Sequence, residues 1–203
     1  VLEQMVKAGA REDILYDAKP HVGTDVLLTV VQNLRKRIVE LGGEVRFSAQ
    51  VTGLETENGQ LTGVQTDSGE IIPCRAAVLA IGHSARDTFE MLEKTGIPME
   101  PKPFAMGARI EQKQAVIDRA QYGMENPALP PADYKLVEHL EDATVYTFCM
   151  CPGGQVVASA SEEGRIVTNG MSNADREGEN ANAALLVTLN PEVFPYPGPL
   201  GGM

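Results

Sequence analysis

The segments Val51-Thr-Gly-Leu-Glu-Thr56 and Leu61-Thr-Gly-Val-Gln-Thr66 alternate apolar and polar side chains, and Asn58-Gly59 stands between them. Alternation with a period of two is typical of a strand with one buried face, and Asn-Gly between two such runs is the strongest short signal for a tight hairpin. Asp67-Ser68-Gly69 supplies a second turn, and residues 70–73 begin a third strand. The sequence therefore predicts a three-stranded β-meander over residues 51–73.

Upstream of the meander, residues 24–41 have the spacing of an amphipathic helix. Thr24 is a natural N-cap, and Asp25 suits the positive end of the helix dipole. Gly42-Gly43 supplies the stop signal. The apolar residues that recur on one face of this helix are Leu27, Val31, Leu34, Ile38 and Leu41.

Two short apolar segments flank the meander. Residues 44–47 follow the helix directly and have the composition of a short strand. Residues 76–81 form an unbroken apolar run that ends at Gly82, which is typical of a strand buried on both faces of a parallel sheet. The order helix, strand, meander and buried strand predicts an α/β arrangement in residues 1–95.

The second half of the chain has a different pattern. Pro98, Pro101 and Pro103 predict a domain boundary, so we expect a second domain over residues 96–203. Short strands are predicted at residues 104–110, 144–149 and 155–160, with one helix at 114–120 and a proline-rich loop at 127–131. This pattern predicts a largely antiparallel sheet and a mixed α+β fold for the whole chain.

Composition narrows the class of protein. The chain has 17 basic and 28 acidic residues, a net charge of −11, which argues against partners such as nucleic acid or anionic membrane surfaces. No stretch approaches the roughly 20 apolar residues that span a bilayer. Three cysteines make no disulfide framework, so we expect a reducing cytoplasm. The partner that we expect is a small-molecule substrate.

Few residues are candidates for chemistry. Gly82 ends the predicted buried strand, where backbone can approach a ligand, and His83 follows it as either a ligand contact or a structural histidine. Cys149 and Cys151 precede Pro152-Gly153-Gly154, which predicts a structural turn, with a thiol facing a cofactor or a substrate as the alternative. Arg109 and Glu111 fit either an ion pair or an anion site. No zinc-ligand spacing is present, so no metal is expected.

The order of elements over residues 24–83 resembles the two-dinucleotide-binding-domain flavoproteins. In that family a valine touches adenine in a strand that precedes a meander, and the closing strand ends in Ala-Thr-Gly; here the triplet is Ala80-Ile81-Gly82. Three further strings look like an uncharacterised family of bacterial FAD-dependent dehydrogenases: residues 102–111, 146–154 and 167–172, with Asn180-Ala-Asn-Ala183. The resemblance implies a partial Rossmann-like FAD domain interrupted by a substrate domain. It also implies that the FAD-binding residues of this chain are Val51, Ala80, Ile81, Gly82 and His83.

One departure from these families affects the expected function. The glycine loop G-x-G-x-x-G, which places the pyrophosphate on a helix N-terminus, occurs nowhere in the 203 residues. The first residue, Val1, and the loop-like residues 195–203 read as the ends of an internal piece. We therefore expect FAD in a longer parent oxidoreductase and no tight FAD binding by this chain. An exposed edge at residues 76–81 would then favour homo-oligomers.

Two other functions fit the sequence. One is a stand-alone αβ module that binds a small ligand or a protein without catalysis; a strand with G-x-G-x-x-G encoded upstream of Val1 would exclude it. The other is a disulfide oxidoreductase that uses Cys149 and Cys151, which full parent activity after replacing both by Ser would exclude.

Overall fold

The computed structural model describes residues 1–124, 128–160 and 163–202. By packing, the chain divides into two compact units, each built from two separate stretches. Unit 1 comprises Val1–Val45 and Ala105–Thr188, and unit 2 comprises Arg46–Phe104 and Leu189–Met203. These units do not coincide with the domains predicted to meet at residues 95–96, and that division stays a prediction. Pro127, in the predicted proline-rich loop, lies outside the described residues.

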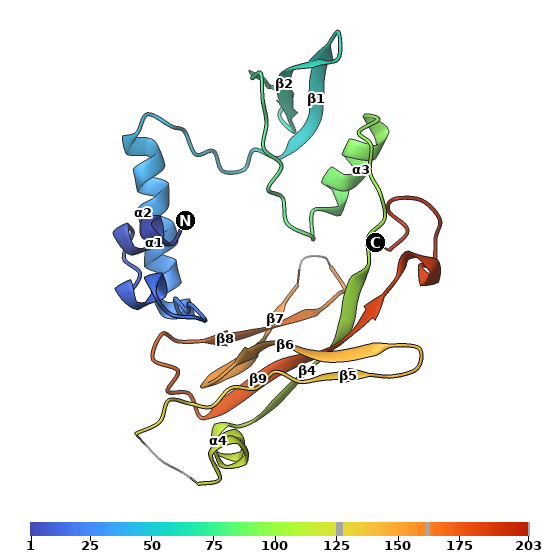
Figure 1. Cartoon of the computed structure of the whole chain (residues 1–203). Helices are drawn as coiled ribbons and strands as arrows, with labels where there is room; N and C mark the ends of the chain where they lie inside the picture. Colours follow the sequence, from blue (N-terminus) through green and yellow to red (C-terminus); the bar gives the residue numbers. More distant parts are fainter. Residues whose placement is uncertain (125–127, 161–162, 203) are drawn as a thin grey trace. The chain divides into compact units, whose positions relative to one another are not determined.

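Unit 2 contains the predicted β-meander. Strands β1 (Val51–Glu57), β2 (Gln60–Thr66) and β3 (Ile71–Pro73) form an antiparallel sheet in the order β1-β2-β3. Glu57 pairs with Gln60, so Asn58 and Gly59 are the two turn residues, and both have positive φ (51° and 76°). This is the tight hairpin turn that Asn-Gly favours, and Figure 1 shows the hairpin of β1 and β2. Helix α3 (Arg86–Lys94) and the short turn η2 (Pro191–Val193) complete the unit.

The two predicted strands that flank the meander are wrong. Residues 44–47 and 76–81 form no strand, and Phe47 and Val78 are 70% and 92% exposed. A strand exists only through pairing, and no strand among the described residues pairs with either segment. The structure is thus mixed α and β, with antiparallel pairing wherever the direction of a strand pair is described. The described residues do not confirm the Rossmann-like parallel sheet.

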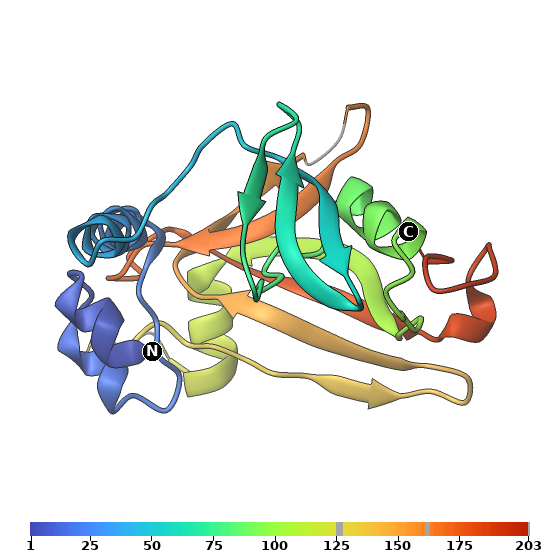
Figure 2. The ribbon, with the colours of Figure 1, turned by 90° about the horizontal axis from the view of Figure 1, so that it is seen from above.

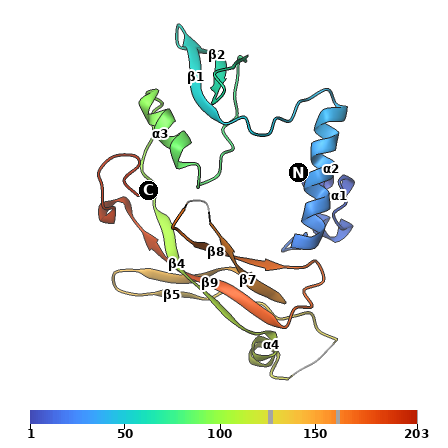
Figure 3. The ribbon, with the colours of Figure 1, turned by 180° about the vertical axis from the view of Figure 1, so that it is seen from behind.

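Unit 1 begins with a helical subassembly. Helix α1 (Leu2–Lys7), the 3-10 turn η1 (Glu12–Leu15) and helix α2 (Thr24–Glu40) pack together, as Figures 1 and 3 show. Ile14 and Val30 are fully buried in their core, with Val26 and Leu34 packed against them. Helix α2 is confirmed, but the N-cap is Gly23 and not Thr24. The predicted apolar face is mostly outside this core, because Leu27, Val31, Ile38 and Leu41 remain exposed.

The rest of unit 1 is an antiparallel β-structure with one helix. The four-stranded sheet has the order β4-β9-β6-β5, from β4 (Phe104–Lys113), β5 (Val137–His139), β6 (Thr144–Cys151) and β9 (Asn180–Leu189). Strands β7 (Gly154–Ser159) and β8 (Val167–Ser172) form a separate ribbon that runs along the sheet, as Figures 1 and 2 show, and β8 contacts β6. Helix α4 (Gln114–Tyr122) buries Ile117 against Ala132 and Ala181. The predicted strands at 104–110, 144–149 and 155–160 and the helix at 114–120 are confirmed.

Candidate functional site

The residues predicted to contact FAD all lie in unit 2. Val51 opens β1 opposite Thr66. Ala80, Gly82 and His83 are exposed and Ile81 is half-buried, in a segment that is not the end of a strand. Gly82 has φ +69°, with open space where a side chain would stand, so its backbone is accessible to a ligand. The imidazole Nδ1 of His83 lies 2.8 Å from the Ser84 hydroxyl, a local structural contact. Nothing in these contacts tests the predicted role of the five residues.

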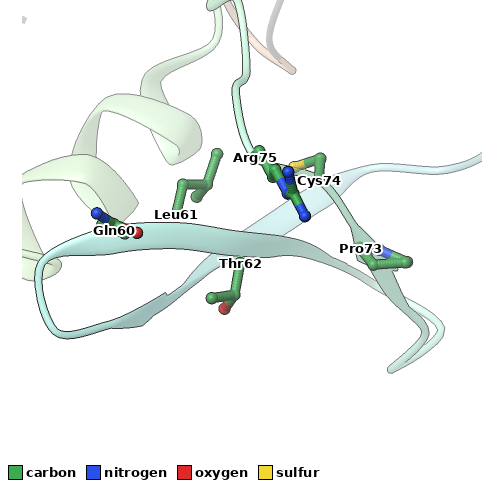
Figure 4. Close-up of a pocket in the computed structure, with 6 residues that line it drawn as sticks. All are labelled: Gln60, Leu61, Thr62, Pro73, Cys74 and Arg75. Carbon is green, nitrogen blue, oxygen red and sulfur yellow. The ribbon is translucent and has the colours of Figure 1, made fainter.

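A pocket of about 550 Å³ lies on the meander itself (Figure 4). Figure 4 shows Leu61 and Arg75 on one side of β2 and Thr62 on the other. The Cys74 amide donates to the Thr62 carbonyl (3.1 Å), which extends the β2–β3 pairing to the edge of the pocket. The lining offers one guanidinium and no carboxylate or imidazole, so it lacks an acid–base pair; it consists of Gln60, Leu61, Thr62, Pro73, Cys74 and Arg75.

A second pocket, of about 400 Å³, lies within unit 1 and is lined mostly by polar residues and glycines. It is formed by the start of α2, the turn between β6 and β7, the end of β8 and the start of β9, including Thr24, Gln155, Ser172 and Asn180. Gly153 and Gly178 also line it, and their backbones touch: a Cβ at Gly178 would overlap the Gly153 carbonyl. We call this cavity the polar pocket.

One wall of the polar pocket is held by the segment before α2. The Thr24 hydroxyl donates to the Ser172 carbonyl (3.2 Å), and His21 Nε2 lies 2.9 Å from the Asn173 carbonyl and 3.3 Å from the Ser172 hydroxyl. A carbonyl can only accept, so Nε2 carries a proton and cannot take one from Ser172. The pair of Ser172 and His21 is therefore structural and not a nucleophile with its base.

Asp25 fastens the same wall. Its carboxylate accepts the Ala174 amide (2.9 Å), and this hydrogen bond lowers the pKa of Asp25 more than partial desolvation raises it. A carboxylate with a lowered pKa contributes stability above its ordinary pKa and loses it as the pH falls through the folded value. Gly23, the N-cap of α2, has φ +85°, and a Cβ on this residue would overlap the Ala174 backbone. The start of α2 is thus held tightly against residues 172–174.

Beside the polar pocket, Arg109 of β4 lies in a network of neutral partners. Its Nη1 donates to Asn182 Oδ1 (2.6 Å) and to the Cys149 carbonyl (3.4 Å), and its Nη2 donates to Asn169 Oδ1 (3.3 Å). Asn182 is 1% exposed, and a Cβ at Gly170 would overlap both the guanidinium and the Asn182 amide. Within the described part of the chain, Arg109 Nε and Asn182 Nδ2 are buried without a hydrogen-bond partner. The network joins β4, β9, β6 and β8 around one half-buried cation.

Glu111, which was a candidate partner of Arg109, makes other contacts. Its two oxygens accept the Val156 amide (2.6 Å) and the Asn180 side-chain amide (2.8 Å). Glu111 therefore ties β4 to β7 and to the start of β9. The ion pair that was one of the two alternatives for Arg109 and Glu111 is not among the ion pairs of the described residues.

Cys149 and Cys151 lie where β6 bulges and turns into β7. The register with β9 shifts between Phe148 and Cys151, and Cys149 has φ +47°. Pro152 and Gly153 form the turn, as predicted from the sequence. Burial raises the pKa of the Cys151 thiol, and the nearby Arg109 guanidinium opposes this only in part. None of the three cysteines is in a disulfide.

We expect iodoacetamide to alkylate Cys149 several-fold faster than Cys151 at neutral pH. The thiolate is the reactive form of cysteine. Cys149 is exposed, whereas Cys151 is half-buried and its thiol has a raised pKa. Peptide mass spectrometry of a time course measures both rates, with Cys149→Ser and Cys151→Ser variants to assign them. Faster labelling at Cys151 would mean that Arg109 activates the thiol, which would favour the disulfide oxidoreductase.

The second half of the chain has known relatives. Residues 103–203 match the family described as FAD-dependent protein, C-terminal domain-like. The second half of the chain is therefore similar to the C-terminal domain of FAD-dependent proteins. The chain is also 50% identical over 207 residues to an uncharacterized protein of Clostridium beijerinckii (strain ATCC 51743 / NCIMB 8052). That match covers 100% of this chain and 39% of the relative, so the chain spans about two fifths of the relative's length.

The similarity to FAD-dependent proteins confirms the sequence resemblance at this coarse level and covers the whole β-sheet of unit 1, including the Arg109 network. In the described residues, no three His, Cys, Asp or Glu side chains gather as a metal site would require. No helix in this part of the chain is both long and apolar enough to cross a bilayer.

Sequence reasoning missed several residues of this FAD-related region. Asn182, Asn169 and Ser172 fell in strings noted only for their resemblance, and their partners lie 60 or more residues away. One signal was present: Asn182 interrupts the small apolar residues Ala181, Ala183 and Ala184, and a polar residue in such a run is buried only with partners.

Proposed function

We propose that the chain is part of an FAD-dependent oxidoreductase that acts on a small-molecule substrate. The match of residues 103–203 to the C-terminal domain of FAD-dependent proteins carries this proposal. The β-meander of residues 51–73, which the flavoprotein resemblance implies, supports it. A cytoplasmic location remains part of the proposal.

The residues of this chain fit one side of FAD only. Val51 on β1 and the open backbone at Gly82 suit the adenosine side. A pyrophosphate needs several backbone amides directed at it from a glycine loop and a helix N-terminus, and the sequence contains no such loop. The start of α2 does not replace it, because Asp25 already occupies that end of the helix with a negative charge. FAD, when bound by a complete protein, would supply the acceptor for two electrons.

We assign the substrate side to the polar pocket of unit 1. Its walls offer neutral donors and acceptors from Gln155, Ser172 and Asn180. They also include the Glu179 carboxylate, which forms an ion pair with Lys113 (2.5 Å). This lining suits a polar small molecule. Because Gly153 and Gly178 have no side chains, their backbones can lie in contact at this wall of the pocket. The hydrogen bond between Arg109 and Asn182 holds the neighbouring strands β4 and β9 together. These residues bind and orient, and the redox chemistry belongs to the cofactor.

The proposal predicts a difference in flavin content. We expect the 203-residue chain to show no FAD binding at micromolar concentration, because the pyrophosphate contacts are missing. We expect the longer Clostridium beijerinckii relative to be yellow after purification, because it would retain its flavin. Quenching of flavin fluorescence measures the first, and the absorbance spectrum measures the second, with circular dichroism to verify that both are folded. A folded, colourless relative that takes up no added FAD would overturn the flavoprotein proposal, and micromolar binding by the short chain would show that the glycine loop is dispensable.

A binding module without catalysis is the second candidate, and the pocket on the meander favours it because none of the residues predicted to bind FAD lines this pocket. A relative that binds FAD but reduces or oxidises no substrate would favour this candidate. A relative whose flavin is reduced by a substrate would exclude it.

A further inference from the structure

The end of β6 holds two cysteines in one short stretch of irregular backbone. The pairing with β9 advances by three residues on β6, from Phe148 to Cys151, while it advances by only two on β9. The extra residue makes this a β-bulge. Cys149 lies inside the bulge with φ +47°, a left-handed conformation that residues other than glycine rarely adopt. Bulges and strained residues of this kind are concentrated at functional sites.

The bulge places the sulfur of Cys151 against the backbone of Cys149. The Cys151 thiol donates to the Cys149 carbonyl, with Sγ 3.3 Å from the oxygen. Residues that are two positions apart have Cα atoms separated by at most about 7 Å. A disulfide joins residues whose Cα atoms are about 4.4–6.8 Å apart. The spacing of this pair is therefore compatible with an intramolecular disulfide, and the bulge brings one sulfur toward the other residue.

Charge and exposure give the two thiols different properties. Burial raises the pKa of the Cys151 thiol, and the Arg109 guanidinium lowers it in part. A negative charge on Cys149 raises that pKa further, whereas Arg176 lowers it, so the Cys151 thiol interacts with Cys149 and with two cations. Cys149 is exposed and Cys151 is half-buried, and neither is in a disulfide. An oxidant from solution can therefore reach Cys149, and Cys151 is the thiol beside it.

The pair also lies next to the polar pocket. Gly153 and Gly154, which follow Cys151 after one proline, both line that pocket. The position of a Cβ on Gly154 would be 3.1 Å from the Cys151 Cβ. A change at Cys151 is thus one residue contact away from the wall of the pocket.

We propose that Cys149 and Cys151 form a reversible disulfide beside the polar pocket, made by exchange with a small disulfide such as oxidised glutathione. The pair is a site of reversible oxidation in the chain itself and needs no bound cofactor. It therefore does not depend on the flavoprotein proposal.

The exchange has two steps. The Cys149 thiolate attacks one sulfur of the small disulfide, whose sulfur–sulfur bond breaks, and one thiolate leaves. The Cys151 thiolate then attacks the Cys149 sulfur and displaces the second small thiolate. The chain loses two hydrogen atoms, and the oxidant takes up two electrons and two protons to become two small thiols. A ring closed by residues so near in the chain is strained, so an excess of small thiol opens it again.

Equilibration of the chain in mixtures of oxidised and reduced glutathione tests the disulfide. After acid quenching and alkylation, cleavage at lysine and arginine puts Cys149 and Cys151 in peptide 136–165 and Cys74 in peptide 47–75. We expect wild-type peptide 136–165 to become two hydrogen atoms lighter, with neither alkylation nor bound glutathione. Cys151→Ser should instead retain glutathione on Cys149. The matched control, Cys74→Ser, should close the ring like wild type.

The same equilibration in concentrated urea separates the effect of the bulge from closeness along the chain. We expect the equilibrium constant for closing the ring to be about tenfold higher in the folded chain, because the bulge holds the Cys151 sulfur near Cys149 whereas an unfolded chain samples many conformations. Circular dichroism of the oxidised chain verifies that it remains folded.

Three results would overturn the proposal. A folded wild-type chain that binds glutathione at Cys149 but closes no ring would show that the two thiols do not meet in the native structure. Equal constants in the folded and the unfolded chain would show that the bulge contributes nothing. Loss of the native circular dichroism on oxidation would assign the disulfide to the unfolded chain. All three results come from wild type, so none depends on whether a cysteine variant folds.

Discussion

Replacement of Gly153 by Ala should remove about 3 kcal/mol or more of the unfolding free energy, the largest loss expected from adding one methyl group to this chain. Gly153 has φ +58°, and a non-glycine residue in that region costs about 1–2 kcal/mol. The new Cβ would also overlap the Arg176 carbonyl, and relieving a clash with a backbone atom costs about 1–3 kcal/mol more. The shift would disturb the hydrogen bond from the Gly153 amide to Gln114 Oε1 (2.9 Å).

Gly123→Ala is the matched control for this experiment. Gly123 lies in the same unit with φ +75°, but among the described residues no atom lies within 4 Å of the position that an added Cβ would take. Alanine there should cost only the backbone term of about 1–2 kcal/mol. Urea unfolding followed by circular dichroism measures both variants. Equal losses in the two variants would show that the Arg176 carbonyl can move away, and that the wall of the polar pocket is softer than its contacts indicate.

The parts of the fold that could be predicted are those whose signals are local. Asn58 and Gly59 set the turn of the β1–β2 hairpin because both need positive φ, and neighbouring residues alone fix that preference. The end of α2 near Gly42 and the turn at Pro152-Gly153 are local in the same way. No partner far along the chain is needed for any of them.

The strand predicted at residues 76–81 failed for the opposite reason. Its apolar run describes what a buried parallel strand looks like, but burial requires neighbouring strands, and none of the described strands pairs with it. Helix α2 shows the same limit: periodicity found an apolar face, yet the core uses Val26 and Val30 at the border of that face and leaves Val31 exposed. A pattern gives the faces of an element and does not say which neighbour covers them.

The candidate site was the least predictable part, since its contacts join distant residues. Arg109 was noted as a strand residue with either an ion-pair or an anion-binding role, and the structure gives it amide and carbonyl partners instead. Only the three-dimensional pairing of β4 with β9 brings Asn182 to it across 73 residues. Strands β5 and β8 were not predicted. Strand β5 has only three residues, and β8 shows little alternation of apolar and polar side chains.

Truncation of Arg109 to Ala should cost about 2–4 kcal/mol of stability, because it leaves the buried Oδ1 of Asn182 without a donor and removes the apolar stem from the space between the strands. Asn182→Ala should cost a similar amount, since the half-buried guanidinium loses its shortest hydrogen bond. The double variant should lose about 1–3 kcal/mol less than the sum of the two, the coupling expected for direct contact. Arg109→Lys keeps the charge but not the planar guanidinium, so its loss of stability should lie between zero and the loss in Arg109→Ala.

Lys113 and Glu179 provide the matched control pair for this cycle. They join the end of β4 to the residue before β9 through an ion pair of 2.5 Å, but their side chains are 57% and 79% exposed. Water screens such a pair, so its coupling should not exceed about 1 kcal/mol. Urea unfolding of the two cycles side by side makes the comparison. Equal coupling in both would mean that burial adds nothing to the contact between Arg109 and Asn182.

The alkylation rate of Cys151 is a second measurement of the same network. A general loss of stability would change this rate in the opposite direction. The Arg109 guanidinium lowers the pKa of the Cys151 thiol against the larger effect of burial, so removing the cation should raise that pKa further. In folded Arg109→Ala, alkylation of Cys151 should therefore become slower at a fixed pH, whereas unfolding would make it faster. Slower labelling, with Cys149 unchanged, would establish that the cation acts on the thiol inside a folded site.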